Sequence, residues 1–195
     1  MNPVKARSPR AVAAILCGLV MTSCAAPPLS LYTLQASNLP AAAVPFSHAA
    51  TVIEIRRVVL PDYLDTQDIL VRNGSTLQRS PHGRWASRLS IEITRYLTGL
   101  LAAQRPGALV TDQPQAETPH DRILITISNL DVTTAGRAML QANWTIVPRN
   151  EAQPVRNRRA LFTVDGSTKT DQDVVVLTQA VLRRLADAIG IARLR

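Results

Sequence analysis

The apolar pattern of residues 122–191 constrains the fold more than any other feature of the chain. Three segments place apolar side chains at alternate positions, which is the period of a half-buried β-strand; they cover residues 122–130, 138–147 and 157–164. Short polar stretches join them, so we expect an antiparallel meander. The last segment, from about residue 171 to 191, repeats apolar residues at spacings of three and four and predicts an amphipathic helix.

The first half of the chain predicts further strands. In residues 52–60, the side chains of Ile53, Ile55 and Val59 are expected on one face. The dipeptide Asn73-Gly74 fits the positive φ angles of a type I′ turn, so we expect a hairpin around it. The candidate strands are residues 31–34, 52–60, 68–72 and 75–79.

A second amphipathic helix is expected over residues 85–103, opened by Arg84-Trp85 and closed by Pro106-Gly107. Two helices that are each apolar on one face can cover one side of a sheet. The predicted fold class is therefore α/β (α+β), a two-layer sandwich of a mixed, largely antiparallel sheet of about six strands with two amphipathic helices.

The N-terminus has the pattern of a secretory signal. Three basic residues precede an eleven-residue apolar run, residues 11–21, which is shorter than the roughly 20 residues that span a bilayer. The following Met21-Thr22-Ser23-Cys24 resembles a bacterial lipobox, in which the cysteine becomes the lipidated N-terminus of the mature protein. The basic residues are Lys5, Arg7 and Arg10.

Cleavage before Cys24 would remove residues 1–23, including Cys17, and leave one cysteine that cannot form an intramolecular disulfide. The alternative is a free thiol on Cys24 after ordinary secretion. By resemblance to lipoprotein sorting in Gram-negative bacteria, Ala25 after the cysteine implies the periplasmic face of the outer membrane. The expected organisation is a cleaved signal peptide (1–23), a lipidated tether (24–30) and one periplasmic domain (31–195).

The net charge of the chain limits the classes of partner that we expect it to bind. The sequence has 22 Lys and Arg against 14 Asp and Glu, and three of the basic residues lie in the leader. An exported protein does not meet nucleic acid, so we expect no nucleic-acid partner. A moderately basic domain is consistent with anionic phospholipid or an acidic protein partner, or with a solvated surface alone.

No constellation of catalytic or metal-ligating residues stands out. Asp62, Asp65 and Asp68 are spaced by three, but they flank a proline and a hairpin, where solvated aspartates are common. The sequence holds no nucleophile elbow, P-loop or dinucleotide fingerprint. We therefore expect neither an enzyme nor a cofactor, apart from covalent lipid on Cys24. The histidines, His48, His82 and His120, lie far apart in expected loops.

Four residues are candidate partner contacts. Arg84 and Trp85 lie at the expected start of the first helix, and Arg183 and Arg184 lie towards the end of the last one. The periodic spacing of Trp85 with the apolar residues that follow favours a core position over an exposed contact.

After the lipobox, the chain holds an ordered set of short motifs: Tyr32-Thr33-Leu34, Val58-Val59-Leu60-Pro61-Asp62-Tyr63-Leu64, Ile69-Leu70-Val71-Arg72, Arg84-Trp85 and the C-terminal helix. In this order and spacing they resemble the PqiC (YmbA) family of auxiliary lipoproteins from ABC-type, MCE-containing transport systems. The chain departs from the family at Leu31, where an aromatic residue is often found.

The resemblance implies a non-catalytic outer-membrane component that docks an MCE-domain (PqiB-like) protein and helps phospholipid to pass between the membranes. Because MCE proteins form rings, homo-oligomerisation of this chain is expected. Two alternatives remain open: a lipoprotein that binds peptidoglycan or regulates a cell-wall enzyme, and a periplasmic hydrolase.

Overall fold

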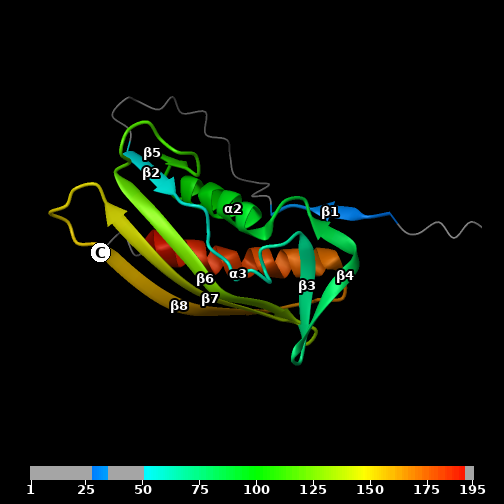
Figure 1. The fold of residues 1–195 in the computed structure, drawn as a ribbon. Coiled ribbons are helices and arrows are strands. Elements are labelled where there is room, and N and C mark those ends of the chain that lie inside the picture. Colours follow the sequence, from blue (N-terminus) through cyan, green and yellow to red (C-terminus); the bar gives the residue numbers. More distant parts are fainter. Residues whose placement is uncertain (1–27, 35–50, 192–195) are drawn as a thin grey trace, which may run out of the picture.

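The computed structural model describes residues 28–34 and 51–191, which form two helices and an eight-stranded mixed sheet (Figure 1). The predicted two-layer α/β class is confirmed, with more strands than the six or so expected. The strands are β1 (Ser30–Tyr32), β2 (Thr51–Ile55), β3 (Asp68–Asn73), β4 (Thr76–Trp85), β5 (Ala108–Thr111), β6 (Asp121–Thr133), β7 (Arg137–Pro148) and β8 (Arg156–Asp165); the helices are α2 (Leu89–Ala103) and α3 (Asp171–Ile191).

Strand β6 organises the sheet because it is longer than its neighbours on one side. Along one edge it pairs with β7, which pairs with β8, and both pairings are antiparallel, so the predicted meander is confirmed. Along the other edge, the start of β6 pairs in parallel with β2 and its last residue, Thr133, pairs with β3. Beyond β2 lies β5, and beyond β3 lie β4 and then β1.

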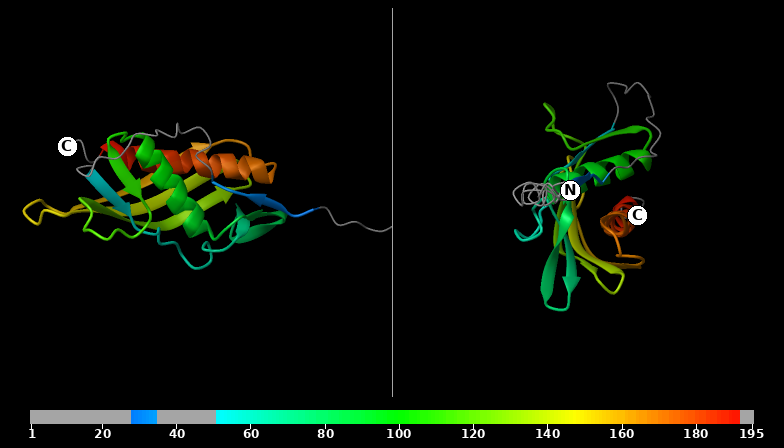
Figure 2. Two further views of the ribbon diagram at one scale, coloured as in Figure 1. Left: turned by 90° about the horizontal axis from the view of Figure 1, so that it is seen from above. Right: turned by 90° about the vertical axis from the view of Figure 1, so that its right-hand side faces the viewer.

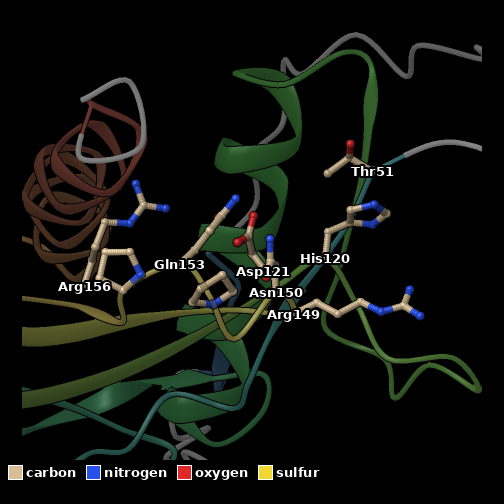
Figure 3. Close-up of a pocket in the computed structure, with 9 residues that line it drawn as sticks. Thr51, His120, Asp121, Arg149, Asn150, Gln153 and Arg156 are labelled. Carbon is tan, nitrogen blue, oxygen red and sulfur yellow. The ribbon is translucent and has the colours of Figure 1, made fainter.

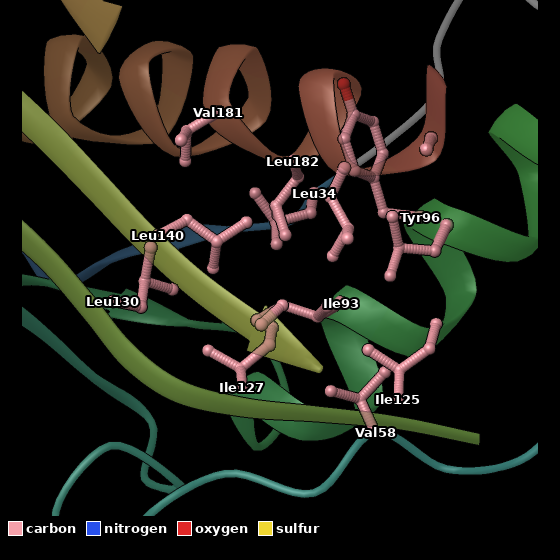
Figure 4. Close-up of a cluster of buried hydrophobic side chains, with 14 of the residues drawn as sticks. Leu34, Val58, Ile93, Tyr96, Ile125, Ile127, Leu130, Leu140, Val181 and Leu182 are labelled. Carbon is pink, nitrogen blue, oxygen red and sulfur yellow. The ribbon is translucent and has the colours of Figure 1, made fainter. Parts of the chain in front are cut away.

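Both helices cover one face of this sheet (Figure 2). The apolar side chains of the inward-facing strand positions meet those of α2 and α3 in a continuous core (Figure 4). Burial of each such Leu or Ile side chain stabilises the fold by about 1.5–3 kcal/mol. Neither helix of the described residues is long and apolar enough to span a bilayer. The labelled core residues in Figure 4 include Ile93, Ile125, Ile127, Leu140, Val181 and Leu182.

Helix α3 has the bounds that the sequence predicts. Its N-terminus carries a capping box: the amide of Asp173 donates to the Thr170 hydroxyl at 3.1 Å, and the amide of Thr170 donates to the Asp173 carboxylate at 3.1 Å. The hydroxyl of Ser167 also donates to this carboxylate, and these hydrogen bonds lower the pKa of Asp173.

The predicted start of the first helix was wrong. Trp85 ends strand β4, where its amide donates to the carbonyl of Gln67, and helix α2 begins at Leu89. The residue before the helix, Arg88, provides no side-chain cap. Instead, Asp65 caps the helix from a distant loop, because its carboxylate accepts a 3.1 Å hydrogen bond from the amide of Ser90.

The predicted strand over residues 52–60 was too long. Strand β2 ends at Ile55, and the irregular step that follows changes which side chains point inward. Val58 is therefore buried, whereas Val59, expected on the inner face, is 58% exposed. The amide of Val58 donates to the Thr94 hydroxyl at 3.0 Å, which fixes this segment against α2.

The β3–β4 hairpin forms as predicted, but its turn differs. Asn73 and Thr76 are the last paired residues, so Gly74 and Ser75 form the loop. Gly74 has a φ of 58°, and no described non-glycine residue has a positive φ. Asn73 therefore does not take the left-handed conformation that a type I′ turn would require of it.

A buried glutamate ties the segment after β1 to the core. Glu92 of α2 is 4% exposed, and its carboxylate accepts hydrogen bonds from the amide of Leu34, at 3.1 Å, and from the hydroxyl of Ser87. The side chain of Leu34 is buried in the core. The short segment that leads from the N-terminus is thus held by the first turn of α2.

We predict that Glu92→Ala lowers the free energy of unfolding by about 1–3 kcal/mol, because it leaves the buried amide of Leu34 without its acceptor. Amide hydrogen exchange at Leu34 should accelerate. Denaturant unfolding and exchange measured by mass spectrometry check this, with Arg95→Ala on the exposed face of α2 as the control. Unchanged exchange at Leu34 would contradict the assigned bond.

The cap on α2 predicts a pH dependence. Burial raises the pKa of Asp65, but hydrogen bonds from Ser90 and the charges of Arg88 and Arg57 outweigh it, so the pKa of Asp65 lies below its usual range. The carboxylate therefore stabilises the fold above the usual aspartate pKa, and this contribution is lost as the pH falls through the lowered value.

Asp65→Ala should lower the free energy of unfolding by about 1 kcal/mol at pH 7, the typical value of a helix cap. The difference from the wild type should shrink as the pH falls below the usual aspartate pKa. Denaturant unfolding between pH 7 and pH 2 checks this, with the exposed Asp62→Ala as the control. A difference that stays constant down to pH 2 would be inconsistent with the cap.

Candidate functional site

A polar hollow of about 780 Å³ lies where four strand ends meet (Figure 3). The antiparallel register opposes Asp121, at the start of β6, to Pro148, at the end of β7, and the return strand β8 begins at the same edge. Strand β2 runs parallel to β6, so its first residues also lie at this edge. The lining residues are Thr51, His120, Asp121, Pro148, Arg149, Asn150, Gln153, Pro154 and Arg156.

The lining is rich in hydrogen-bond donors. The guanidinium groups of Arg149 and Arg156 lie on opposite sides of the hollow in Figure 3, and the side-chain amides of Asn150 and Gln153 lie between them. Guanidinium and amide groups recognise carboxylate and phosphate oxygens through charge-assisted hydrogen bonds. The buried carboxylate of Asp121, 4% exposed, adds an acceptor at the centre of the hollow.

The position of His120 is fixed by the strands around it. Its carbonyl accepts a 2.8 Å hydrogen bond from the amide of Arg149, and its own amide donates to the carbonyl of Val52. Its Nδ1 atom lies 3.4 Å from the amide of Val52, an arrangement in which Nδ1 accepts. With Nδ1 as the acceptor, the Nε2–H group provides a further donor at the rim.

Next to the hollow, a buried glutamate joins two strands. The carboxylate of Glu54 on β2 is 4% exposed, and it accepts hydrogen bonds from Arg56 and Arg122, each at 3.1 Å. Both arginine side chains are exposed, 56% for Arg56 and 40% for Arg122, so solvent screens the two ion pairs, and their main effect is to satisfy the buried carboxylate. This network holds the start of β6 against β2 and so keeps the edge of the hollow in place.

The candidate contact residues predicted from the sequence do not line this hollow. Arg84 lies 3.0 Å from the carboxylate of Asp68 and also donates to the carbonyls of Ser80 and Gly83. Trp85 is 3% exposed, so its side chain lies in the core rather than on the surface.

The two candidate arginines of α3, Arg183 and Arg184, are exposed. The guanidinium of Arg183 lies over the Tyr96 ring, 5.9 Å from its centroid. Burial raises the pKa of Tyr96, and the nearby charge of Arg183 opposes that rise. Cys24 lies outside the described residues.

Two of the three spaced aspartates have structural roles, and Asp62 is exposed. Asp65 caps α2, and Asp68 pairs with Arg84 and with Arg79 at 3.6 Å. Among the residues that the structure describes, no three His, Cys, Asp or Glu side chains gather as metal ligands would. His82 is exposed, and His48 lies outside the described residues.

The hollow itself was missed in the sequence, although a signal for it exists. The alternating pattern of the meander sets its register, and that register brings His120, Arg149 and Arg156 to one edge. Each residue lies just outside a predicted strand, and the sequence singles out only His120, as one of three histidines in expected loops.

The family model described as "ABC-type transport auxiliary lipoprotein component" matches residues 32–190. The chain belongs to this family. The family includes PqiC (YmbA), so the resemblance seen in the sequence is confirmed, and the protein is a lipid-anchored auxiliary component of an ABC-type transport system. No curated protein matches the sequence significantly.

Two solved structures share the fold. A crystal structure titled only as an uncharacterised protein has a TM-score of 0.68 at 16% identity, over 85% of this chain and 98% of the other. A protein from Xanthomonas campestris has a TM-score of 0.61 at 14% identity, over 83% of this chain and 92% of the other. At these identities the similarity shows the fold alone.

Proposed function

We propose that this protein is a non-catalytic, outer-membrane lipoprotein that docks the MCE-domain protein of an ABC-type system and supports the transfer of phospholipid between the membranes. The family assignment over residues 32–190 supports the auxiliary role. The lipobox at residues 21–24 and the Ala25 that follows support lipidation of Cys24 and retention in the outer membrane.

The arrangement of the two ends of the domain is the observation that carries this proposal. Cys24 is four residues before Pro28, the first described residue, and four residues extend over at most about 14 Å. A lipid on Cys24 therefore places the bilayer near β1. The hollow lies at the opposite end of the domain, beside the loop that joins β7 to β8 (Figures 1 and 2).

The hollow supports docking because it points away from the proposed anchor and is lined by basic and amide side chains. We propose that Arg149 and Arg156 bind an acidic segment of the MCE protein, which approaches from the periplasm. Because MCE proteins form rings, several copies of this chain meeting one partner would satisfy its symmetry, so we also propose a homo-oligomer.

Recovery of partners from cell envelopes tests the proposal. The full lipidated protein, tagged at its C-terminus, is purified from detergent-solubilised envelopes, and the bound proteins are quantified by mass spectrometry. The wild type should recover an MCE-domain protein. The double variant Arg149→Glu/Arg156→Glu should recover at least about tenfold less of it, which corresponds to about 1.4 kcal/mol.

The matched control is Arg95→Glu, which reverses an exposed charge on α2 and should leave the recovery unchanged. Thermal unfolding verifies that all variants remain folded. Equal recovery by the double variant would exclude the hollow as the docking site. Recovery of sacculi or cell-wall enzymes without an MCE protein would instead support a peptidoglycan-related role and overturn the proposed function.

A further inference from the structure

Two exposed leucines lie at the end of the domain where the chain leads to its lipid. Leu29 is 58% exposed and Leu31 is 64% exposed, the highest values among the large apolar side chains near this end. Leu161 is also exposed, but it lies on β8, far along the chain from Cys24. The position of Leu29 and Leu31 next to Cys24 therefore distinguishes them.

The length of the tether sets an upper limit on the distance from these leucines to the membrane. Leu29 is five positions after Cys24, and a fully extended chain spans about 3.3–3.6 Å per residue. Leu29 therefore lies within about 18 Å of the lipidated backbone, whatever conformation the tether takes. The headgroup layer is itself about 5–8 Å thick, so β1 is held at the surface of the bilayer.

Strand β1 is fixed to the domain, while Leu31 on the strand and Leu29 just before it are exposed. It pairs in parallel with β4, where Leu31 is the register partner of Arg84, and the amide of Ala86 donates to the carbonyl of Tyr32 at 2.7 Å. Three residues after Leu31, Leu34 is buried and bonded to Glu92. The chain thus places Leu34 in the core and directs Leu31 to the outside.

The charges beside β1 are mostly paired within the protein. Arg84 and Arg79 both lie near the carboxylate of Asp68, at 3.0 Å and 3.6 Å, and only Arg79 is largely exposed. Electrostatic attraction to anionic lipid therefore adds little here, and apolar burial supplies the contact.

We propose that Leu29 and Leu31 insert into the boundary between the headgroups and the acyl chains of the bilayer that holds the anchor. This contact gives the domain a fixed orientation, in which the hollow points away from the membrane. The inference rests on the lipidation of Cys24 in the proposed function, but not on the identity of the docking partner.

Site-specific fluorescence tests the insertion. After the proposed signal cleavage, Cys24 is the only cysteine of the chain, and the proposed lipid blocks its thiol, so an introduced cysteine is a unique labelling site. Full lipidated protein carrying Leu31→Cys is labelled with an environment-sensitive fluorophore in phosphatidylethanolamine–phosphatidylglycerol vesicles that contain spin-labelled lipid. The control label is Val155→Cys, an exposed residue beside the hollow.

Quenching of the label at position 31 should be at least about threefold that at position 155. The quenching at position 31 should change little when phosphatidylcholine replaces phosphatidylglycerol, because apolar burial and not lipid charge supplies the contact. A reporter at Leu29→Cys should lose most of its quenching when Leu31→Asp is added, because a carboxylate does not enter the apolar boundary. Equal quenching at positions 31 and 155 would overturn the insertion.

A separate measurement distinguishes failure of the insertion from failure of the anchor. The Cys24→Ser variant should leave the membrane fraction, whereas the wild type remains in it. If the wild type itself is not membrane-bound, lipidation fails and both proposals fall. If it is membrane-bound and still recovers its MCE partner, but position 31 is not quenched, only the insertion is wrong.

Discussion

The ladder between β6 and β7 is the interaction on which the rest of the structure depends. It runs along the whole of both strands and presents one face of alternating apolar side chains to the helices. The edge of β6 that faces away from β7 pairs with β2 at the start of β6 and with β3 at its end, so one strand joins both ends of the domain. The hollow forms at one end of this ladder, and β1 joins the sheet beyond the other.

The parts of the fold that the sequence predicts are those whose signals are local. The meander follows from a period of two, and α3 follows from a period near 3.6 together with the capping box of Thr170 and Asp173. In both cases the local sequence indicates the type of the element and also where it begins and ends. The fold class could therefore be predicted before any tertiary contact was known.

The elements that differ from the prediction depend on distant residues or on irregular steps. Helix α2 begins at Leu89 because Asp65, more than twenty residues earlier, caps it. In β6 a bulge at Ser128 moves the inward side from odd to even positions, so that both Ile127 and Leu130 are buried. A simple alternation predicts neither change, because both are set by tertiary packing.

The candidate site is likewise set by tertiary structure, since it forms from residues that are far apart in the sequence. The lining residues of the hollow form no motif in the sequence, and the register of three strands brings His120, Arg149 and Arg156 together. The family assignment gives the protein an auxiliary role in transport, and the geometry separates the end that leads to Cys24 from the end that carries the hollow. A domain with two such ends is consistent with the proposed role, in which the protein joins a membrane to a periplasmic partner.

The most direct test of this account is photo-cross-linking in living cells. A photoreactive amino acid is placed at Asn150, on the rim of the hollow, or at Leu161, which is 63% exposed on β8. The account predicts a cross-link to an MCE-domain protein from position 150 and none from position 161. A cross-link from position 161 alone would contradict it, because the partner would then meet the sheet instead of the end opposite the anchor.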